Sequence, residues 1–281
     1  MTPLTPSELA HFDLFGYLVF PGLLADRIDE LIRGFEEVWA AHGGGAGGRP
    51  HDGTVHSSMA QFMDQSPRLH TLLDDPRTHD ILASLLGNDF NYVGSDGNYY
   101  IGDSQWHSDT YNIPGGLRFI KMALYLDPVT RATGALRVIP GSHRQGEPFA
   151  DQLEREIRQC ETVWGVLGPQ VPAVALASNP GDVVVFNHAL KHASFGGSKH
   201  RRMFTLNCCQ RFPDAHLPYL RGYIDNHAYY QVERLHHALL VHTATPERLV
   251  HLEQVRANDF HLAELLALSR AQTASAPAQM T

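Results

Sequence analysis

"FNYVGSDGNYY" (residues 90–100) opens a region whose residue pattern differs from everything before it. From here to about residue 212, short runs rich in β-branched and aromatic residues recur, and turn residues separate them. Many short strands with few helices between them predict a β-sandwich or barrel, so we expect a double-sheet core over about 90–212. The later runs are "FIKMALYL" (119–126), "ALRVIP" (135–140), "AVAL" (173–176), "DVVVF" (182–186) and "MFTLNCCQRF" (203–212).

The residues before this region predict a helical N-terminal layer. A first helix is expected over about 6–15, and an amphipathic helix within 25–42, where apolar residues recur with the 3.6-residue helical period. The glycine-rich stretch 43–53 is predicted to be a surface loop, and whether it acts as a lid stays open. Two further helices are expected near 66–74 and 76–86.

Helical patterns also follow the strand-rich region. After residue 213 we expect irregular structure, then a helical extension over 245–271 and a disordered tail over about 271–281. One helix, over 149–160, interrupts the strands. The predicted fold class is therefore mainly β with helices (α+β), as one domain spanning 1–281.

Charge and cysteine content narrow the class of protein. The formal net charge is −8, and lysine and arginine form no long run, so we expect no nucleic-acid partner. The odd cysteine set (Cys160, Cys208 and Cys209) does not fit a disulfide framework and predicts a cytoplasmic setting. The chain begins without a signal-peptide pattern and has no apolar run of membrane-spanning length, so we expect no membrane association.

"QWHSDTYN" (105–112) holds a candidate pair of metal ligands, His107 and Asp109. Side chains two apart on an extended segment point to the same face, so an imidazole and a carboxylate here can bind one metal ion. Such pairs also occur by chance. A metal site therefore requires a third ligand from another part of the chain.

"NPGDVVVFNHALKHASFGG" (179–197) offers two histidines after a turn and a buried strand, His188 and His192. Further on, Arg201 and Arg202 begin another strand, and a guanidinium there can hold a carboxylate in a bidentate manner. Because adjacent residues of a strand point to opposite faces, only one of the two arginines can point into the core.

Two imidazoles and one carboxylate with other coordination positions open are the ligand set of non-haem Fe(II) oxygenases. Three protein ligands leave three octahedral positions free. A 2-oxo acid can chelate through two of these positions, and O2 can take the last. An arginine nearby would anchor the far carboxylate of the 2-oxo acid.

Taken together, these motifs resemble the phytanoyl-CoA dioxygenase family of Fe(II)/2-oxoglutarate-dependent oxygenases over about residues 6–212. The resemblance implies a double-stranded β-helix (a jelly-roll, cupin-like core) with a helical N-terminal layer and a C-terminal helical extension. It is carried by "FDLFGYLVFPGLL" (12–24), "WHSD" (106–109), "MALYLDPVTRATGALRVIPGSHRQG" (122–146), "NPGDVVVFNHALKHAS" (179–194) and the arginine-led last strand.

By position, the resemblance implies that His107, Asp109 and His192 are the metal ligands. The family's distal histidine follows a Gly-Asp pair and an apolar strand and precedes a serine by two residues. His192 with Ser194 matches this pattern, and His188 does not.

The resemblance also implies residues that bind 2-oxoglutarate. Arg201 matches the arginine that opens the next strand, although a short gap after His192 leaves Arg202 as the alternative. Ser194 resembles the hydroxyl partner of the same carboxylate. Asn98 is a further predicted contact to the 2-oxo acid, with a plain turn residue as the alternative.

The implied cofactors are Fe(II), the co-substrate 2-oxoglutarate and O2. The implied reaction oxidises, most simply hydroxylates, an unactivated C–H bond of a small molecule such as a natural-product intermediate, with release of succinate and CO2. Related halogenases have a small residue in place of the carboxylate ligand, so Asp109 predicts oxygenation. Desaturation, epoxidation and ring formation stay open, as does the choice between a monomer and a homodimer.

Three other interpretations of the function remain open at this point. A cupin-type metal isomerase or dioxygenase that does not use 2-oxoglutarate would need the triad but not Arg201. A zinc hydrolase built on "HALKH" (188–192) would lack the usual glutamate base. A non-catalytic jelly-roll module would bind a ligand without turnover.

Lys121 is assigned to a solvated face, with contact to an anionic substrate as its alternative role.

Overall fold

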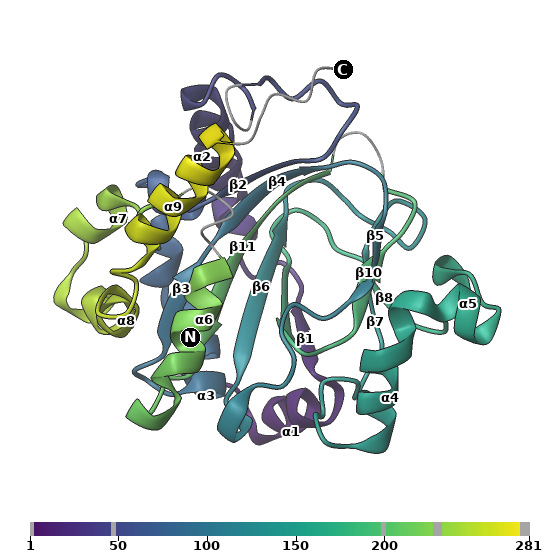
Figure 1. Ribbon diagram of the computed structural model, residues 1–281. Coiled ribbons are helices and arrows are strands. Elements are labelled where there is room, and N and C mark those ends of the chain that lie inside the picture. Colours follow the sequence, from purple (N-terminus) through teal and green to yellow (C-terminus); the bar gives the residue numbers. More distant parts are fainter. Residues whose placement is uncertain (1–2, 46–48, 198–200, 227–231, 276–281) are drawn as a thin grey trace.

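Two antiparallel sheets form the centre of the computed structural model and share an apolar interior (Figure 1). The structure describes residues 3–45, 49–197, 201–226 and 232–275. This arrangement agrees with the predicted double-sheet core.

The larger sheet separates a layer of helices from the interior between the sheets. Its strand order is β1-β9-β6-β11-β4-β2, and β3 pairs with β11. Along β6, Ile120 and Met122 pack in the helix-side cluster, whereas Ala123 and Tyr125 pack in the cluster between the sheets, which is the alternation of a strand covered on both faces. Since β1 and β2 precede residue 90, this sheet extends beyond the predicted range. The strands are β1 (Tyr17–Phe20), β2 (Ser57–Ala60), β3 (Asn91–Gly94), β4 (Asp96–Tyr100), β6 (Phe119–Tyr125), β9 (Val183–Asn187) and β11 (Arg201–Cys209).

The smaller sheet has the order β5-β10-β7-β8 and lies across the interior from the larger one (Figure 1). All its strand pairs are antiparallel. Its strands are β5 (Ser104–His107), β7 (Leu136–Val138), β8 (Val174–Leu176) and β10 (His192–Ser194).

Helices from both ends of the chain surround the sheets. The first helix begins at a capping box, in which Thr5 Oγ1 accepts from the Glu8 backbone N–H and the Glu8 carboxylate accepts from the Thr5 backbone N–H. It ends at Gly16, whose φ of 84° suits glycine. The helices are α1 (Pro6–Phe15), α2 (Ile28–Ala41), α3 (Pro76–Leu86), α4 (Pro148–Glu156), α5 (Cys160–Trp164), α6 (Leu217–Asp225), α7 (Ala238–His242), α8 (Pro246–Arg256) and α9 (Leu262–Ser275).

Three helical predictions need correction. The segment near 66–74 forms only a short 3-10 helix at His70–Leu73, because Pro76 holds the residue before it extended and starts a new helix. Helices α6 and α7 lie where we expected irregular structure. Helix α9 continues through 271–275, where we expected a disordered tail, and its alanines and leucines favour helix. Residues 276–281 of that tail lie outside the described part of the chain.

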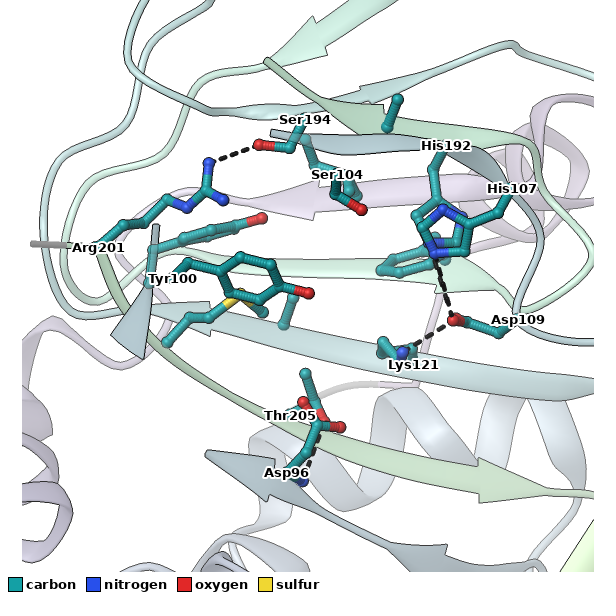
Figure 2. A pocket seen from close by; sticks show the side chains of 16 residues that line it. Asp96, Tyr100, Ser104, His107, Asp109, Lys121, His192, Ser194, Arg201 and Thr205 are labelled. Atoms are coloured by element: carbon teal, nitrogen blue, oxygen red, sulfur yellow. Dashed lines mark hydrogen bonds and ion pairs between the residues drawn. The ribbon is translucent and has the colours of Figure 1, made fainter. Parts of the chain in front are cut away.

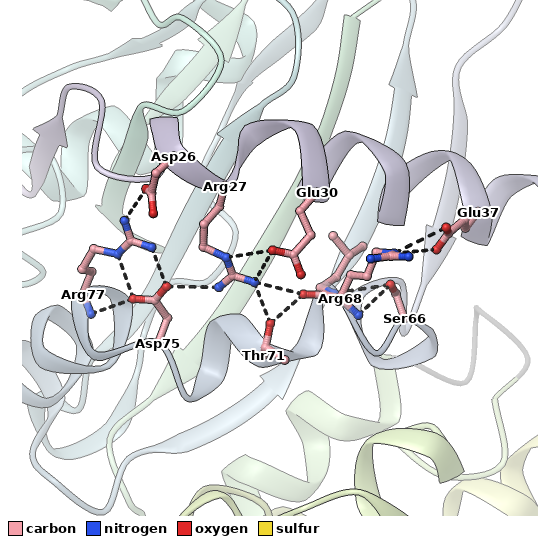
Figure 3. A network of polar contacts seen from close by, with 10 residues as sticks. Asp26, Arg27, Glu30, Glu37, Ser66, Arg68, Thr71, Asp75 and Arg77 are labelled. Carbon is pink, nitrogen blue, oxygen red and sulfur yellow. Dashed lines mark hydrogen bonds and ion pairs between the residues drawn. The ribbon is translucent and has the colours of Figure 1, made fainter.

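A network of hydrogen bonds and ion pairs connects the start of α3 with the start of α2 (Figure 3). Asp75 caps α3 by accepting from the backbone N–H of Arg77, and its carboxylate also pairs with the guanidinium groups of Arg77 (2.8 Å) and Arg27 (3.1 Å). Hydrogen bonds from Arg77 lower the pKa of Asp75 to about 2. The ionised carboxylate therefore contributes to the stability of the fold.

We expect Asp75→Asn to lower the free energy of unfolding at pH 7 by about 1–2 kcal/mol, allowing for partial screening of these ion pairs. Asparagine keeps the helix cap, so the loss is chiefly ionic. Because folding lowers this pKa, the stabilisation exists above the ordinary aspartate value and disappears as the pH falls toward 2. Urea unfolding of both proteins should show that their difference in free energy of unfolding shrinks from pH 4 downward. A difference that is the same at every pH would contradict an ionic origin of this stabilisation.

Candidate metal centre and co-substrate pocket

A small cavity lies between the two sheets, and most of the predicted site residues line it. Figure 2 shows His107, Asp109 and His192 at one end of this cavity and Arg201 with Ser194 at the other.

The three predicted ligands come from the pairing of β5 with β10. His107 ends β5 and His192 begins β10, and the register of the two strands sets them opposite each other. Asp109 follows two residues after β5, and its Oδ1 lies 4.0 Å from Nε2 of His107 and 3.8 Å from Nε2 of His192. One ligand atom from each residue lies within 4.8 Å of the others, which is close enough to hold a single metal ion.

Backbone hydrogen bonds orient both imidazoles. Nδ1 of His107 lies 2.6 Å from the carbonyl oxygen of Gln105, and Nδ1 of His192 lies 2.8 Å from that of Leu190. A carbonyl only accepts, so each Nδ1 carries the hydrogen and each Nε2 keeps its lone pair for a metal.

The charge state of the triad also suits a divalent cation. Burial, together with the neighbouring His107, lowers the pKa of His192 to about 3, so this ring is neutral at pH 7. Burial alone would raise the pKa of Asp109, but Lys121 and the nearby histidines lower it well below its usual range. Two imidazoles and an ionised carboxylate fit Fe(II).

His188 does not join this group. It lies in the turn after β9, is 2% exposed, and neither of its ring nitrogens has a hydrogen-bond partner among the described residues. Its backbone carbonyl accepts from the N–H of Asp109 at 2.8 Å, so it supports the loop that carries a ligand. Burial lowers the pKa of the ring to about 4.

The two adjacent arginines point to opposite sides of the larger sheet. Arg201 is buried in the cavity, where its Nη1 donates to Ser194 Oγ (2.5 Å) and to the carbonyl oxygen of Gly134 (2.7 Å). Its Nε is buried without a partner among the described residues, as expected where an acceptor such as a carboxylate would bind. Arg202 instead pairs with Asp127 and Glu36, each at 2.7 Å, outside the cavity.

Asn98 does not line the cavity, contrary to our expectation of a contact with the 2-oxo acid. Its side-chain oxygen accepts from Nε2 of His56 (2.9 Å), and its amide donates to Asp96 (2.5 Å), so both ends are already used. The cavity wall at this point is formed by Asp96.

The loop over 43–53 lies partly outside the described residues, at 46–48. In its described part, His51 stacks on Tyr99, and no residue of the loop lines the cavity. The lid role stays a hypothesis.

Lys121 lies at this site, although the sequence analysis assigned it to a solvated face. It lies on β6, lines the cavity, and its Nζ is 3.0 Å from Asp109 Oδ2. Burial alone would lower the pKa of Lys121, but Asp109 and Asp96 raise it, so the amine is protonated. A lysine inside the otherwise apolar run "FIKMALYL" was the available signal.

Comparisons with known proteins agree with the fold. The family model for phytanoyl-CoA dioxygenase (PhyH) matches residues 12–204. Ectoine dioxygenase of Sphingopyxis alaskensis is 28% identical over 221 residues, which are 69% of this chain and 71% of that protein. Crystal structures of EctD from S. alaskensis with bound Fe (TM-score 0.57) and in the apo form (TM-score 0.56) are both 26% identical, covering 74% of this chain and 78% of theirs. The nogalamycin carbocyclase SnoK shares the fold, with 21% identity, a TM-score of 0.56, and coverage of 74% of this chain and 84% of its own.

Fold and site together define a non-haem Fe(II)- and 2-oxoglutarate-dependent dioxygenase. The chain belongs to the phytanoyl-CoA dioxygenase family, whose model matches well over half of it. The predicted family, fold class and cofactors are thereby confirmed, and an isomerase or dioxygenase independent of 2-oxoglutarate is not favoured.

Proposed function

We propose that this chain hydroxylates an unactivated C–H bond of a small molecule, using O2 and 2-oxoglutarate and releasing succinate and CO2. The observation that supports this most strongly is the shared cavity. A triad of metal-binding side chains lies at one end, and a buried arginine–serine pair that can bind a carboxylate lies at the other.

In this proposal, His107, Asp109 and His192 hold Fe(II), and Arg201 donates hydrogen bonds to the far carboxylate of 2-oxoglutarate. Ser194 lies beside that carboxylate, where its hydroxyl accepts from Arg201 and donates to the carbonyl oxygen of Gly134. The bound iron supplies the redox chemistry that couples decarboxylation of 2-oxoglutarate to oxidation of the substrate. The chain itself fixes the orientation of both imidazoles and keeps Arg201 away from bulk water.

The substrate is proposed to be a free small molecule, for example a natural-product intermediate, because the cavity is small. The carboxylate of Asp109 supports oxygenation rather than halogenation. We also propose a single domain that works in the cytoplasm as a monomer or homodimer, in keeping with three free, buried cysteines. Within the described residues, no helix has the length and apolar character needed to cross a membrane.

A succinate assay tests the proposal. With Fe(II), O2 and 2-oxoglutarate, the protein should form succinate slowly on its own, and faster when a true substrate is added. Ectoine is the first compound to try, because ectoine dioxygenase is similar to this chain. Omitting Fe(II) or O2 is the control. Protein that binds iron but forms no succinate above these controls would contradict the proposal.

A further inference from the structure

Lys121 places a full positive charge directly against one of the candidate metal ligands. It lies in the middle of β6, where strand pairing sets it between Phe186 of β9 and Asn207 of β11. Its side chain is only 17% exposed and faces the cavity, below Asp109 in Figure 2.

We propose that Lys121 is a positioning residue that makes Asp109 a one-oxygen ligand, and thereby keeps a coordination position free for 2-oxoglutarate. This inference rests on the proposed function. The two oxygens of Asp109 have different surroundings. Oδ1 faces the Nε2 atoms of His107 (4.0 Å) and His192 (3.8 Å), whereas Oδ2 lies 3.0 Å from the Lys121 ammonium group.

In the described part of the chain, no second side chain forms an ion pair with Oδ2 of Asp109. This oxygen is buried and has no hydrogen-bond partner of normal geometry among the described residues, so the ion pair with Lys121 is its one close polar contact there. The backbone N–H of Asp109 is held by the carbonyl oxygen of His188 at 2.8 Å. The loop is thus fixed at the backbone, and the carboxylate plane is fixed by Lys121.

Removing the ammonium group would leave Oδ2 buried, charged and unpaired beside the metal site. A divalent ion is the strongest attraction available to such an oxygen, so the carboxylate would turn and bind through both oxygens. Binding of this kind uses a position that a triad of single-atom ligands leaves open. Chelation of 2-oxoglutarate, which needs two open positions, would weaken more than iron binding.

Burying a charged lysine at this position costs free energy, which argues that its role is more than packing in the core. Two carboxylates offset its burial, Asp109 in direct contact and Asp96 further away. Lys191 is a useful contrast. Its side chain is fully buried, but it pairs with Glu154 at 2.8 Å, and Glu154 is not part of the triad.

The test uses Lys121→Met, which keeps the length and removes the charge, and Lys121→Arg, which keeps a donor for Oδ2. Lys191→Met is the matched control for loss of a buried lysine. Each protein is titrated anaerobically with Fe(II) and then with 2-oxoglutarate, whose binding is followed by visible absorption. Thermal unfolding of each variant monitors the fold.

We expect Lys121→Met to keep Fe(II) but to bind 2-oxoglutarate at least about tenfold more weakly, in line with the effect of other groups that orient metal ligands. Lys121→Arg should recover most of the affinity, and Lys191→Met should keep it. Unchanged 2-oxoglutarate affinity in Lys121→Met would overturn the inference, as would an equal loss in Lys191→Met. If the unmodified protein bound iron but not 2-oxoglutarate, the proposed function would fail and the inference with it.

Discussion

Replacing His192 with alanine should lower the affinity for Fe(II) by more than 100-fold and abolish turnover. In the proposed metal site the ring supplies a ligand atom directly, and even residues that only orient metal ligands contribute roughly 10–100-fold to metal affinity. The same loss is expected for His107→Ala and Asp109→Ala. Iron binding measured by competition with a chelator, together with succinate formation, gives the result for each variant.

His188→Ala is the control for this series, because it removes a buried histidine that is not part of the metal-binding group. We expect this variant to be less stable but to keep bound iron. If His188→Ala lost iron and His192→Ala kept it, the assignment of the third ligand would be wrong.

Arg201→Ala should have the second large effect, on the affinity for 2-oxoglutarate. Loss of one partner from a buried, hydrogen-bonded charge pair costs about 2–5 kcal/mol, which corresponds to a roughly 30-fold or larger rise in the dissociation constant. Iron binding should persist, because Arg201 lies at the opposite end of the cavity from the triad. Titration of the iron-loaded variant measures the effect.

Arg202→Ala provides the matched comparison. Its guanidinium pairs with Asp127 and Glu36 outside the cavity, so 2-oxoglutarate affinity should stay close to that of the unmodified protein. A large loss in Arg202→Ala with no change in Arg201→Ala would move the anchor to Arg202.

Local patterns in the sequence predicted most of the strands and two of the candidate ligands. Alternating β-rich runs define most of the larger sheet, and the two-residue spacing of His107 and Asp109 sets them on one side of an extended segment. β2, "SSMA" at 57–60, was missed, because neither its composition nor its alternation favours a strand.

The choice between Arg201 and Arg202, and between His188 and His192, depends on tertiary contacts. Whether Arg201 or Arg202 faces the cavity is set by how β11 pairs with β4 and β6, and residue type does not encode that pairing. Likewise, His192 reaches the triad because β10 pairs with β5 opposite His107. The family resemblance favoured the same two residues, and the geometry agrees.

The predictions for Lys121 and Asn98 were wrong in opposite ways: Lys121 lines the cavity and Asn98 does not. A lysine usually indicates solvent, but β6 is covered on both faces, so Lys121 is enclosed and needs a carboxylate. Asn98 shares a strand face with two cavity residues, Asp96 and Tyr100, yet hydrogen bonds with His56 and Asp96 occupy its amide. The bond to His56 joins distant parts of the chain, and no local pattern predicts it.

Anaerobic titration of the metal-free protein with Fe(II) and then 2-oxoglutarate shows whether iron and the co-substrate meet in this cavity. We predict a weak visible charge-transfer band that appears only when both are present, because a 2-oxo acid chelating Fe(II) gives such a band. Arg201→Ala should require far more 2-oxoglutarate to produce it. Protein that binds Fe(II) and shows no band at saturating 2-oxoglutarate would contradict the assignment of this site.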